Sequence, residues 1–188
     1  MGLSSPLFYR EFYNMKDLNS KRIVSTWKGG TTTQLCIEPK DASLQERNFD
    51  LRISSATIDL ERSEFSDFTG YRRYLMKLEG DITLLIDDKE VIIKEDEAFE
   101  FMGDEKVISI SKEPSRDFNV IIKEDRKADI SIIKNKTKGT DEGAYIFALE
   151  DAKLNGKNVE KYSLYESEGE EMSLEGRFIY IKIFTMED

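Results

Sequence analysis

Hydrophobic and polar residues alternate along much of the chain with the two-residue period of β-strands. The clearest example begins at Phe49, where Phe49, Leu51 and Ile53 share one face of an extended chain and Arg52 and Ser54 share the other. One face is therefore apolar, and the other carries a cation beside small polar groups. If the second face points into a barrel, Arg52 becomes a receptor for an anion.

Short strands of this kind recur at the spacing of about 8–12 residues that is typical of β-barrels and sandwiches. Asp87-Asp88-Lys89 and Asn155-Gly156 are tight-turn signals between such strands. We predict that the second signal joins residues 145–149 to residues 159–165. The other predicted strands are residues 22–27, 31–38, 49–58, 72–78, 82–86, 91–93, 98–102, 107–111, 118–122, 130–133 and 178–184. No segment has the pattern of a helix of three turns.

The rhythm of hairpins in the first part of the chain is repeated at reduced length after residue 126, where residues 135–143 form a polar linker. We therefore predict an all-β protein of two stacked barrels. Residues 1–126 form an N-terminal barrel with the candidate pocket, and residues 127–188 form a smaller C-terminal half that packs against it.

The net charge of −10 at pH 7 restricts the partners of the chain. Nucleic acids and anionic membrane surfaces both attract a basic protein face, so neither is expected to bind. No apolar run approaches the roughly 20 residues that span a bilayer, and the first residues lack the basic and apolar regions of a signal peptide. We therefore expect a cytoplasmic protein whose ligand is a small anionic metabolite, bound through a local cluster of cations.

The sequence contains no histidine, and this absence restricts its chemistry more than any other feature. It excludes Ser-His-Asp and Cys-His nucleophile systems, and it removes the usual ligand of zinc, iron and copper. The one cysteine, Cys36, lies in an apolar run and is interpreted as buried and inert. We expect no metal and no cofactor, and a non-catalytic protein is favoured over an enzyme, although Glu, Lys, Arg and Tyr also transfer protons.

Four blocks of sequence resemble the HutD/Ves family. They are WKGGTTTQL at 27–35, FDLRISSAT at 49–57, FSDFTGYRR at 65–73 and RDFNV at 116–120. The resemblance implies a metal-free bicupin, a double barrel with the cupin-like (RmlC-like jelly-roll) fold. It also implies a regulatory or accessory protein of bacterial histidine utilisation that senses a small acidic metabolite of that pathway.

Two departures from the family pattern place the chain in a divergent branch. Where many relatives have Phe-Pro-Gly-Ile-Asp-Arg, this chain has Phe-Thr-Gly-Tyr-Arg-Arg at residues 68–73. The tryptophan block also has two glycines in place of a longer glycine-rich run. The ligand can therefore differ from that of other members.

The candidate ligand-binding residues are Arg52, Ser54, Trp27, Thr32, Arg73, Asp117 and Asn119. The planar guanidinium of Arg52 matches a carboxylate bidentately, and its alternative role is a structural ion pair with Asp117. Trp27 either packs in the core or forms a stacking wall. Arg73 either closes the mouth of the pocket or lies on the surface. Asp117 and Asn119 share one strand face, where they either orient Arg52 and bind the ligand or fix the preceding loop.

Three functions follow from these residues. The first is a binding or regulatory protein with a preformed pocket for a small carboxylate, for which we allow a homodimer. The second is a metal-independent cupin enzyme of the isomerase or epimerase type, which needs two titratable side chains on opposite pocket walls. The third is a scaffold that acts through its surface by strand addition or barrel packing. An acid–base pair would favour the enzyme, an arginine cradle the sensor and a filled barrel the scaffold.

Overall fold

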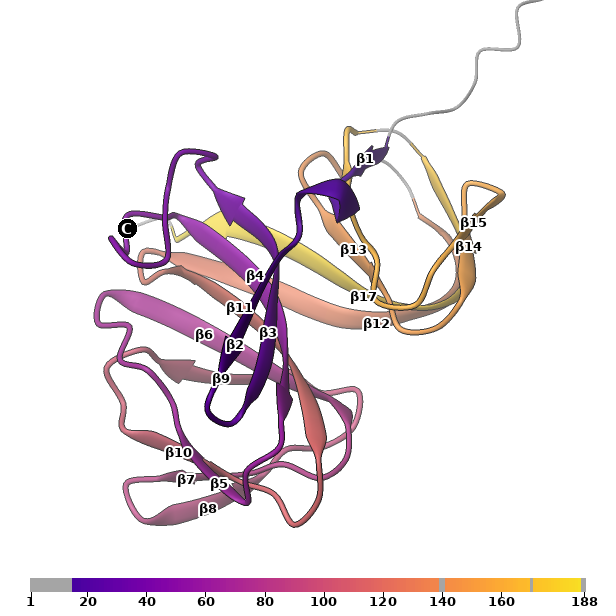
Figure 1. Cartoon of the computed structure of the whole chain (residues 1–188). Coiled ribbons are helices and arrows are strands. Elements are labelled where there is room, and N and C mark those ends of the chain that lie inside the picture. Colours follow the sequence, from indigo (N-terminus) through magenta and orange to yellow (C-terminus); the bar gives the residue numbers. More distant parts are fainter. Residues whose placement is uncertain (1–14, 139–140, 170, 187–188) are drawn as a thin grey trace, which may run out of the picture.

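The computed structural model describes residues 15–138, 141–169 and 171–186, whose regular secondary structure is almost entirely β-strand (Figure 1). Ten strands occupy the first part of the chain: β2 (Ile23–Trp27), β3 (Gly30–Glu38), β4 (Leu51–Ile58), β5 (Arg62–Glu64), β6 (Tyr71–Glu79), β7 (Thr83–Ile86), β8 (Lys89–Ile92), β9 (Phe99–Met102), β10 (Val107–Ile110) and β11 (Ser115–Lys123). The remaining elements are β1 (Met15–Asp17), the short 3₁₀ helix η1 (Asn19–Lys21), β12 (Arg126–Lys138), β13 (Tyr145–Ala148), β14 (Ala152–Leu154), β15 (Lys157–Val159), β16 (Leu164–Ser167) and β17 (Met172–Thr185). No helix in these described ranges has the length and apolar composition to cross a membrane. The all-β prediction is confirmed.

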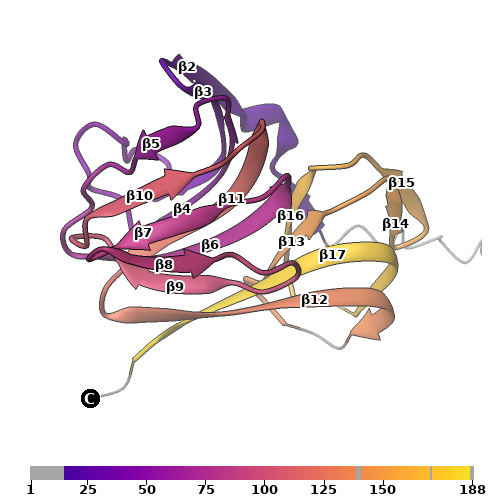
Figure 2. The ribbon, with the colours of Figure 1, turned by 90° about the horizontal axis from the view of Figure 1, so that it is seen from below.

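Two antiparallel sheets build the first barrel. One has the strand order β2-β3-β4-β11-β6-β9, and the other has the order β5-β10-β7-β8 (Figure 2). Leu75 and Phe101 of the six-stranded sheet pack against Leu84 and Val107 of the four-stranded sheet. The inner face of the six-stranded sheet is therefore covered by the smaller sheet, except where a pocket opens between them.

The outer face of the six-stranded sheet packs against a third sheet from the C-terminal part of the chain. This seven-stranded sheet has the order β1-β16-β13-β17-β14-β15, with β12 also paired to β17. The rings of Phe118 in β11 and Phe147 in β13 have centroids 4.5 Å apart at this interface, and Ile53 and Ile181 lie in the same cluster. Both faces of the six-stranded sheet are therefore covered. Alternate side chains of β4 and β11 accordingly point either into the first barrel or into the interface with the third sheet.

The sheets divide close to the predicted boundary at residue 126. β11 ends at Lys123 in the six-stranded sheet, and β12 begins at Arg126 in the seven-stranded one. β1 is the exception, because Met15 pairs with Ser167 of the C-terminal sheet. The division into residues 1–126 and 127–188 as two folding units stays a prediction.

The polar linker predicted at residues 135–143 is wrong for residues 135–138. β12 continues to Lys138 and pairs with β17, which begins at Met172 rather than at Phe178. A bulge at Asn135, with φ of 44°, interrupts the register, and the Gly176 N–H donates to Asn135 Oδ1 at 2.7 Å. The polar residues that indicated a linker belong to a bulged strand at the sheet edge.

The two turn signals have different outcomes. Asp87 and Asp88 adopt φ of 47° and 60° between β7 and β8, as the hairpin prediction requires. Asn155 and Gly156 also form a turn with positive φ, but it joins the three-residue strands β14 and β15. The predicted segments do pair, at Ile146 with Tyr165 and at Phe147 with Leu164, but β14 and β15 lie between them along the chain, so this turn does not join them directly.

Glu79 joins the two halves of the molecule at the end of β6. Its Oε1 accepts hydrogen bonds from the Tyr162 hydroxyl at 2.7 Å and Lys161 Nζ at 3.0 Å, and its Oε2 accepts one from Arg116 Nε at 3.3 Å. The hydrogen bonds from Tyr162 and Lys161 lower the pKa of Glu79 to about 2. Because this pKa falls on folding, the stabilisation is complete above the unfolded pKa near 4.5 and is lost as the pH falls toward 2.

The substitution Glu79→Gln is expected to lower the melting temperature by about 2 °C at neutral pH, since exposed ion pairs contribute at most about 1 kcal/mol. The difference should shrink in concentrated salt and at acidic pH. Differential scanning calorimetry measures it. The control is Glu113→Gln, because the exposed side chain of Glu113 makes no hydrogen bond or ion pair with the described residues. Equal shifts in the two variants would contradict the role of Glu79.

Candidate functional site

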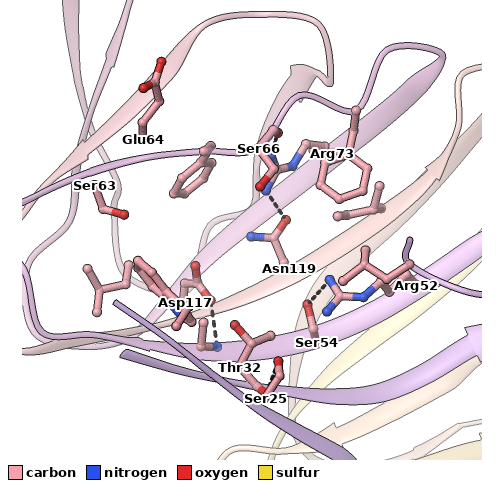
Figure 3. A pocket seen from close by; sticks show the side chains of 17 residues that line it. Ser25, Thr32, Arg52, Ser54, Ser63, Glu64, Ser66, Arg73, Asp117 and Asn119 are labelled. Carbon is pink, nitrogen blue, oxygen red and sulfur yellow. Dashed lines mark hydrogen bonds between the residues drawn. The ribbon is translucent and has the colours of Figure 1, made fainter. Parts of the chain in front are cut away.

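A pocket of about 330 Å³ opens between the two sheets of the first barrel. Its wall includes all seven residues that the sequence singled out: Trp27, Thr32, Arg52, Ser54, Arg73, Asp117 and Asn119 (Figure 3). They come from β2, β3, β4, β6 and β11. The structure therefore brings these residues together at one place, while their role in binding stays a prediction.

The central strand β11 sets the geometry of the pocket. Ile121 pairs with Arg52 of β4 on one side and with Arg73 of β6 on the other. Asn119 and Asp117 precede Ile121 at two-residue intervals and share its face. The two arginines therefore reach the pocket from either side of the strand that supplies the carboxylate and the amide.

Arg52 is held by two neutral partners. Its Nε donates to Gln34 Oε1 at 3.0 Å, and its Nη1 donates to Ser54 Oγ at 3.0 Å. The side chain is almost fully buried, and its Nη2 makes no hydrogen bond with the described residues. The predicted alternative of an ion pair with Asp117 is wrong, because no such pair forms between these two described residues: Arg52 donates to Gln34 and Ser54, and Asp117 accepts from the Ala56 N–H. The guanidinium thus keeps donors for a further acceptor.

Arg73 lies inside a cage of aromatic rings. Its Cζ is 4.8 Å from the ring centroid of Phe65, 5.0 Å from that of Phe101 and 5.3 Å from that of Phe68. Such contacts between a cation and ring faces are attractive. Arg73 is buried, so the interpretation as a surface residue is wrong, and it forms an inner wall of the pocket rather than closing its mouth.

The hydrogen bonds of Arg73 are sparse for a buried guanidinium. Nη1 donates to the carbonyl of Ser66 at 3.2 Å, and Nη2 donates to Asn119 Oδ1 at 3.3 Å. Nε of Arg73 is buried and has no hydrogen-bond partner in the part of the chain that the structure describes. Figure 3 shows Asn119 projecting toward Arg73, while Ser54 projects toward Arg52. Asn119 therefore orients Arg73, not Arg52.

Asp117 is the buried carboxyl of the pocket. Its Oδ1 accepts a hydrogen bond from the Ala56 N–H at 3.0 Å, which ties β11 to β4. Burial raises the pKa of Asp117 to about 6, although the Ala56 N–H and the positive charges of Arg73 and Arg52 act in the opposite direction. The carboxyl therefore changes its charge close to neutral pH.

Burial also shifts the pKa of the two arginines in the pocket. Desolvation lowers the pKa of Arg52 and of Arg73 to about 10, so both guanidiniums remain charged at neutral pH. Neither forms an ion pair with a side chain in residues 15–138, 141–169 or 171–186. Two buried cations thus face one buried carboxyl that titrates near neutral pH, while Glu64, the other carboxylate of the wall, is exposed, so the excess positive charge belongs to the buried groups of the pocket.

The pocket rim is formed by the β2–β3 hairpin. Thr32 of β3 pairs with Ser25 of β2, and both line the pocket. Trp27 is 37% exposed at the end of β2, so the interpretation of this residue as core is wrong. A Cβ atom at Gly30 would lie 2.0 Å from the carbonyl oxygen of Thr57, so only glycine allows the hairpin to approach β4 this closely.

Several contacts of the site were missed in the sequence. Gln34 shares its strand face with Thr32, so the two-residue alternation could have identified it. Phe65 and Phe68 lie in the sequence block at residues 65–73, but aromatic residues in a strand region do not by themselves indicate a contact with a cation. Phe101 follows Arg73 by 28 residues on the neighbouring strand β9, and no local pattern connects the two. Pairing between strands was needed to find it.

The described part of the chain offers no group of three or more cysteine, aspartate or glutamate side chains that could hold a metal ion. Cys36 is buried, and desolvation raises the pKa of its thiol to about 12. The polar and aromatic side chains available to a ligand in the pocket are therefore two guanidiniums, several hydroxyls, an amide, two carboxyls and aromatic rings.

Comparison with known proteins identifies relatives of this arrangement. A family model described as HutD matches residues 18–174, and no curated protein matches the sequence. The structure of HutD from Pseudomonas fluorescens SBW25 gives a TM-score of 0.75 at 22% identity, covering 92% of this chain and 100% of that one. A conserved protein of unknown function from Pseudomonas aeruginosa PAO1 gives 0.73 at 21% identity, covering 91% and 99%.

A more distant structure extends the likeness to other cupins. A Cupin 2 conserved barrel domain protein from Leptotrichia buccalis gives a TM-score of 0.57 at 12% identity, covering 93% of this chain and 97% of that one. At such identities the likeness concerns the fold alone. The cupin-like double barrel predicted from the sequence is confirmed.

Proposed function

The chain belongs to the HutD family, and we propose that it is a non-catalytic binding or regulatory protein whose first barrel takes up a small carboxylate metabolite. One observation carries the proposal: Arg52 and Arg73 are buried in one pocket, and neither has an ion-pair partner among the described residues. A buried charge is costly unless a counter-ion compensates it. An anionic ligand would supply that compensation.

The dimensions of the pocket favour a small dicarboxylate. Its volume of about 330 Å³ is at the lower end of the range for ligand sites. Arg52 and Arg73 lie on strands that flank β11, so their Cα atoms are separated by roughly two strand spacings, or about 10 Å. One carboxylate for each guanidinium fits this arrangement. In the setting that the family resemblance implies, the ligand is a cytoplasmic intermediate of histidine degradation.

A metal-independent isomerase or epimerase is the second candidate, and Asp117 is the observation that favours it. A carboxyl with a pKa of about 6 in a pocket is suited to proton transfer near neutral pH. Glu64, which is exposed, is the other carboxylate in the wall, and the enzyme would need it or a hydroxyl as the partner group. The scaffold hypothesis expects a filled barrel, and the open pocket gives it no support.

Binding is tested with a panel of histidine, urocanate, formiminoglutamate, formylglutamate, formate and glutarate, together with glutaramide as the neutral analogue of glutarate. The dicarboxylates are expected to raise the melting temperature by about 5–10 °C at a hundredfold excess over Kd, because such an excess adds about 2.7 kcal/mol. Glutaramide is expected to give no shift. Equal shifts with glutarate and glutaramide, or none with any acid, would overturn the proposal. If NMR detected the chemical conversion of any compound of the panel, the result would favour the enzyme.

A further inference from the structure

One edge of β3 is covered along only half of its length. β2 pairs with β3 from Gly30 to Gln34, and the pairing ends there because β2 begins at Ile23. Before Ile23 the chain runs through η1 and β1, and β1 pairs with β16 of the C-terminal sheet (Figure 1). Residues 35–38 of β3 therefore pair with β4 alone, and some of their backbone hydrogen-bonding groups point away from β4.

A second pocket of about 330 Å³ opens beside this half of β3. Its walls come from β1, η1, the start of β2 and the end of β3, and they include the apolar side chains of Leu18, Ile23, Leu35 and Ile37. It shares no lining residue with the pocket of Arg52. Its volume lies at the lower end of the range for small-molecule sites. The fold thus provides a separate cavity with a largely apolar interior.

Lysines outnumber carboxylates around the second pocket. Lys16, Lys21 and Lys40 line it, and Glu38 is the acidic residue of its wall. Glu166 lies next to the wall and pairs with Lys16, so the surroundings hold three cations and two carboxylates. Lys21 and Lys40 are exposed, and their Nζ atoms make no hydrogen bond or ion pair with the described residues. In a chain with a net charge of −10, this local excess of one cation favours an anion as the ligand.

Gln34 adds a neutral hydrogen-bond donor to the second pocket. Arg52 Nε can only donate, so the Gln34 atom that it contacts at 3.0 Å is the amide oxygen Oε1. The Nε2 group of Gln34 is then directed away from Arg52 Nε, and it makes no hydrogen bond with residues 15–138, 141–169 or 171–186. Gln34 lines the second pocket and not the first, so this donor is available to a ligand there. The side-chain groups that lack partners at this site are therefore donors, and they require an acceptor.

We propose that the second pocket binds a small amphiphilic monocarboxylate, a carboxylate with a short alkyl chain. The carboxylate oxygens accept hydrogen bonds from the lysines and the Gln34 amide, and the alkyl chain packs against the apolar wall. One negative charge balances the local excess of one cation. Phosphate and dicarboxylates fit less well, because the apolar wall would remove water from charged oxygens without replacing their hydrogen bonds.

An NMR titration of the full, ¹⁵N-labelled chain at constant ionic strength tests the proposal, with hexanoate as the probe. Hexanoate is expected to shift the backbone amide signals of residues 34–38. Butyrate is expected to bind roughly 15-fold more weakly, because each buried methylene strengthens binding about fourfold. Hexanamide, the neutral analogue, is expected to bind at least about tenfold more weakly than hexanoate, because it lacks the charge that the lysines attract.

Charge reversal of the two unpaired lysines assigns the site. The double variant Lys21→Glu, Lys40→Glu is expected to raise the Kd of hexanoate at least about tenfold, because two attractive charges become repulsive. The matched control is Lys106→Glu, Lys112→Glu, which changes the net charge equally at two exposed lysines that line neither pocket. The control is expected to bind hexanoate like the wild type. All four side chains are exposed, so both variants should retain the wild-type circular dichroism spectrum.

Three results would overturn the proposal: no shift with hexanoate, equal affinities for hexanoate and hexanamide, or equal weakening by the two double variants. Shifts confined to residues 117–121 would also overturn it, because they would place hexanoate in the pocket of Arg52 and Arg73. The proposal does not depend on the function of that first pocket. A chain that binds hexanoate at residues 34–38 but no dicarboxylate would reject the first proposal alone, and the reverse result would reject this one alone.

Discussion

Replacing Arg52 by alanine is expected to weaken glutarate binding about 100-fold while the barrel stays folded. Arg52 is buried and held by Gln34 and Ser54, and its Nη2 has no partner among the described residues. Removing one member of a buried, hydrogen-bonded charge pair costs about 2–5 kcal/mol, and about 2.7 kcal/mol corresponds to 100-fold in Kd. Isothermal titration calorimetry at constant ionic strength measures the difference.

The matched control is Arg62→Ala. Arg62 is an exposed arginine on β5, next to the pocket residue Ser63, and its removal changes the net charge by the same amount. This variant is expected to bind glutarate like the wild type. A similar loss in both variants would mean that the general charge of the barrel, rather than a contact with Arg52, determines the affinity.

The stability of the Arg52 variants separates a binding role from a structural one. A buried cation without a counter-ion destabilises the folded protein, and methionine fills most of the same volume without a charge. Arg52→Met is therefore expected to melt at or above the wild-type temperature while it loses binding. A folded Arg52→Met protein with wild-type affinity would remove Arg52 from the site, and unfolding of both variants would assign it a structural role.

Much of the first barrel could be predicted from local sequence. The alternation around Arg52 and Ser54 fixed which side chains share a face, and the Asp87-Asp88 turn fixed a hairpin. These signals depend on neighbouring residues only, because side-chain direction and turn geometry are local properties. The same alternation on β11 placed Asp117 and Asn119 together.

The partners of each site residue could not be predicted in this way. An ion pair with Asp117 is one of the two roles that the sequence allows for Arg52, but the Asp117 carboxylate accepts the Ala56 N–H, and Arg52 donates to Gln34 instead. Which residues meet across strands depends on register, and one bulge shifts every later pair. The bulge between Gln34 and Cys36 is of this kind.

The C-terminal half was harder to predict because its two long strands, β12 and β17, contain polar residues and a bulge. Asn135 and Gly176 suggested breaks, although both lie inside paired strands. Each residue compensates for the irregular backbone of the other, because the Asn135 side-chain oxygen accepts a hydrogen bond from the Gly176 N–H. A residue that ends a strand when considered alone can therefore continue it when its partner is present.

The affinity for glutarate is expected to fall by about 10- to 100-fold between about pH 6 and pH 8, because one linked proton changes affinity by at most tenfold per pH unit. The pKa of Asp117 is about 6, so rising pH places a negative charge beside the bound dicarboxylate. Arg52 and Arg73 keep their charge over this range because their pKa values are about 10. Calorimetric titrations across the range measure the slope.

Asp117→Asn is expected to remove this pH dependence and to bind tightly at pH 8. Asparagine retains an oxygen that can accept the Ala56 N–H, so the tie between β11 and β4 is preserved. Glu64→Gln, in the other carboxylate of the pocket wall, is expected to keep the wild-type slope. A flat wild-type profile, or an unchanged slope in Asp117→Asn, would contradict the assignment.

The same substitution has a second consequence, for stability without ligand. The folded pKa of Asp117 lies above its ordinary value of 3.8, so the wild-type protein loses stability as the pH rises from about 4 through 6 and does not regain it above. Asp117→Asn avoids this loss and should be more stable than the wild type at pH 8, by on the order of 1–3 kcal/mol. Urea denaturation at acidic and alkaline pH checks the sign. Because ligand binding and unliganded stability depend on the same carboxyl, the pH dependence of both should disappear together in Asp117→Asn. A gain in stability without a change in the pH profile of binding would mean that the ligand binds away from Asp117.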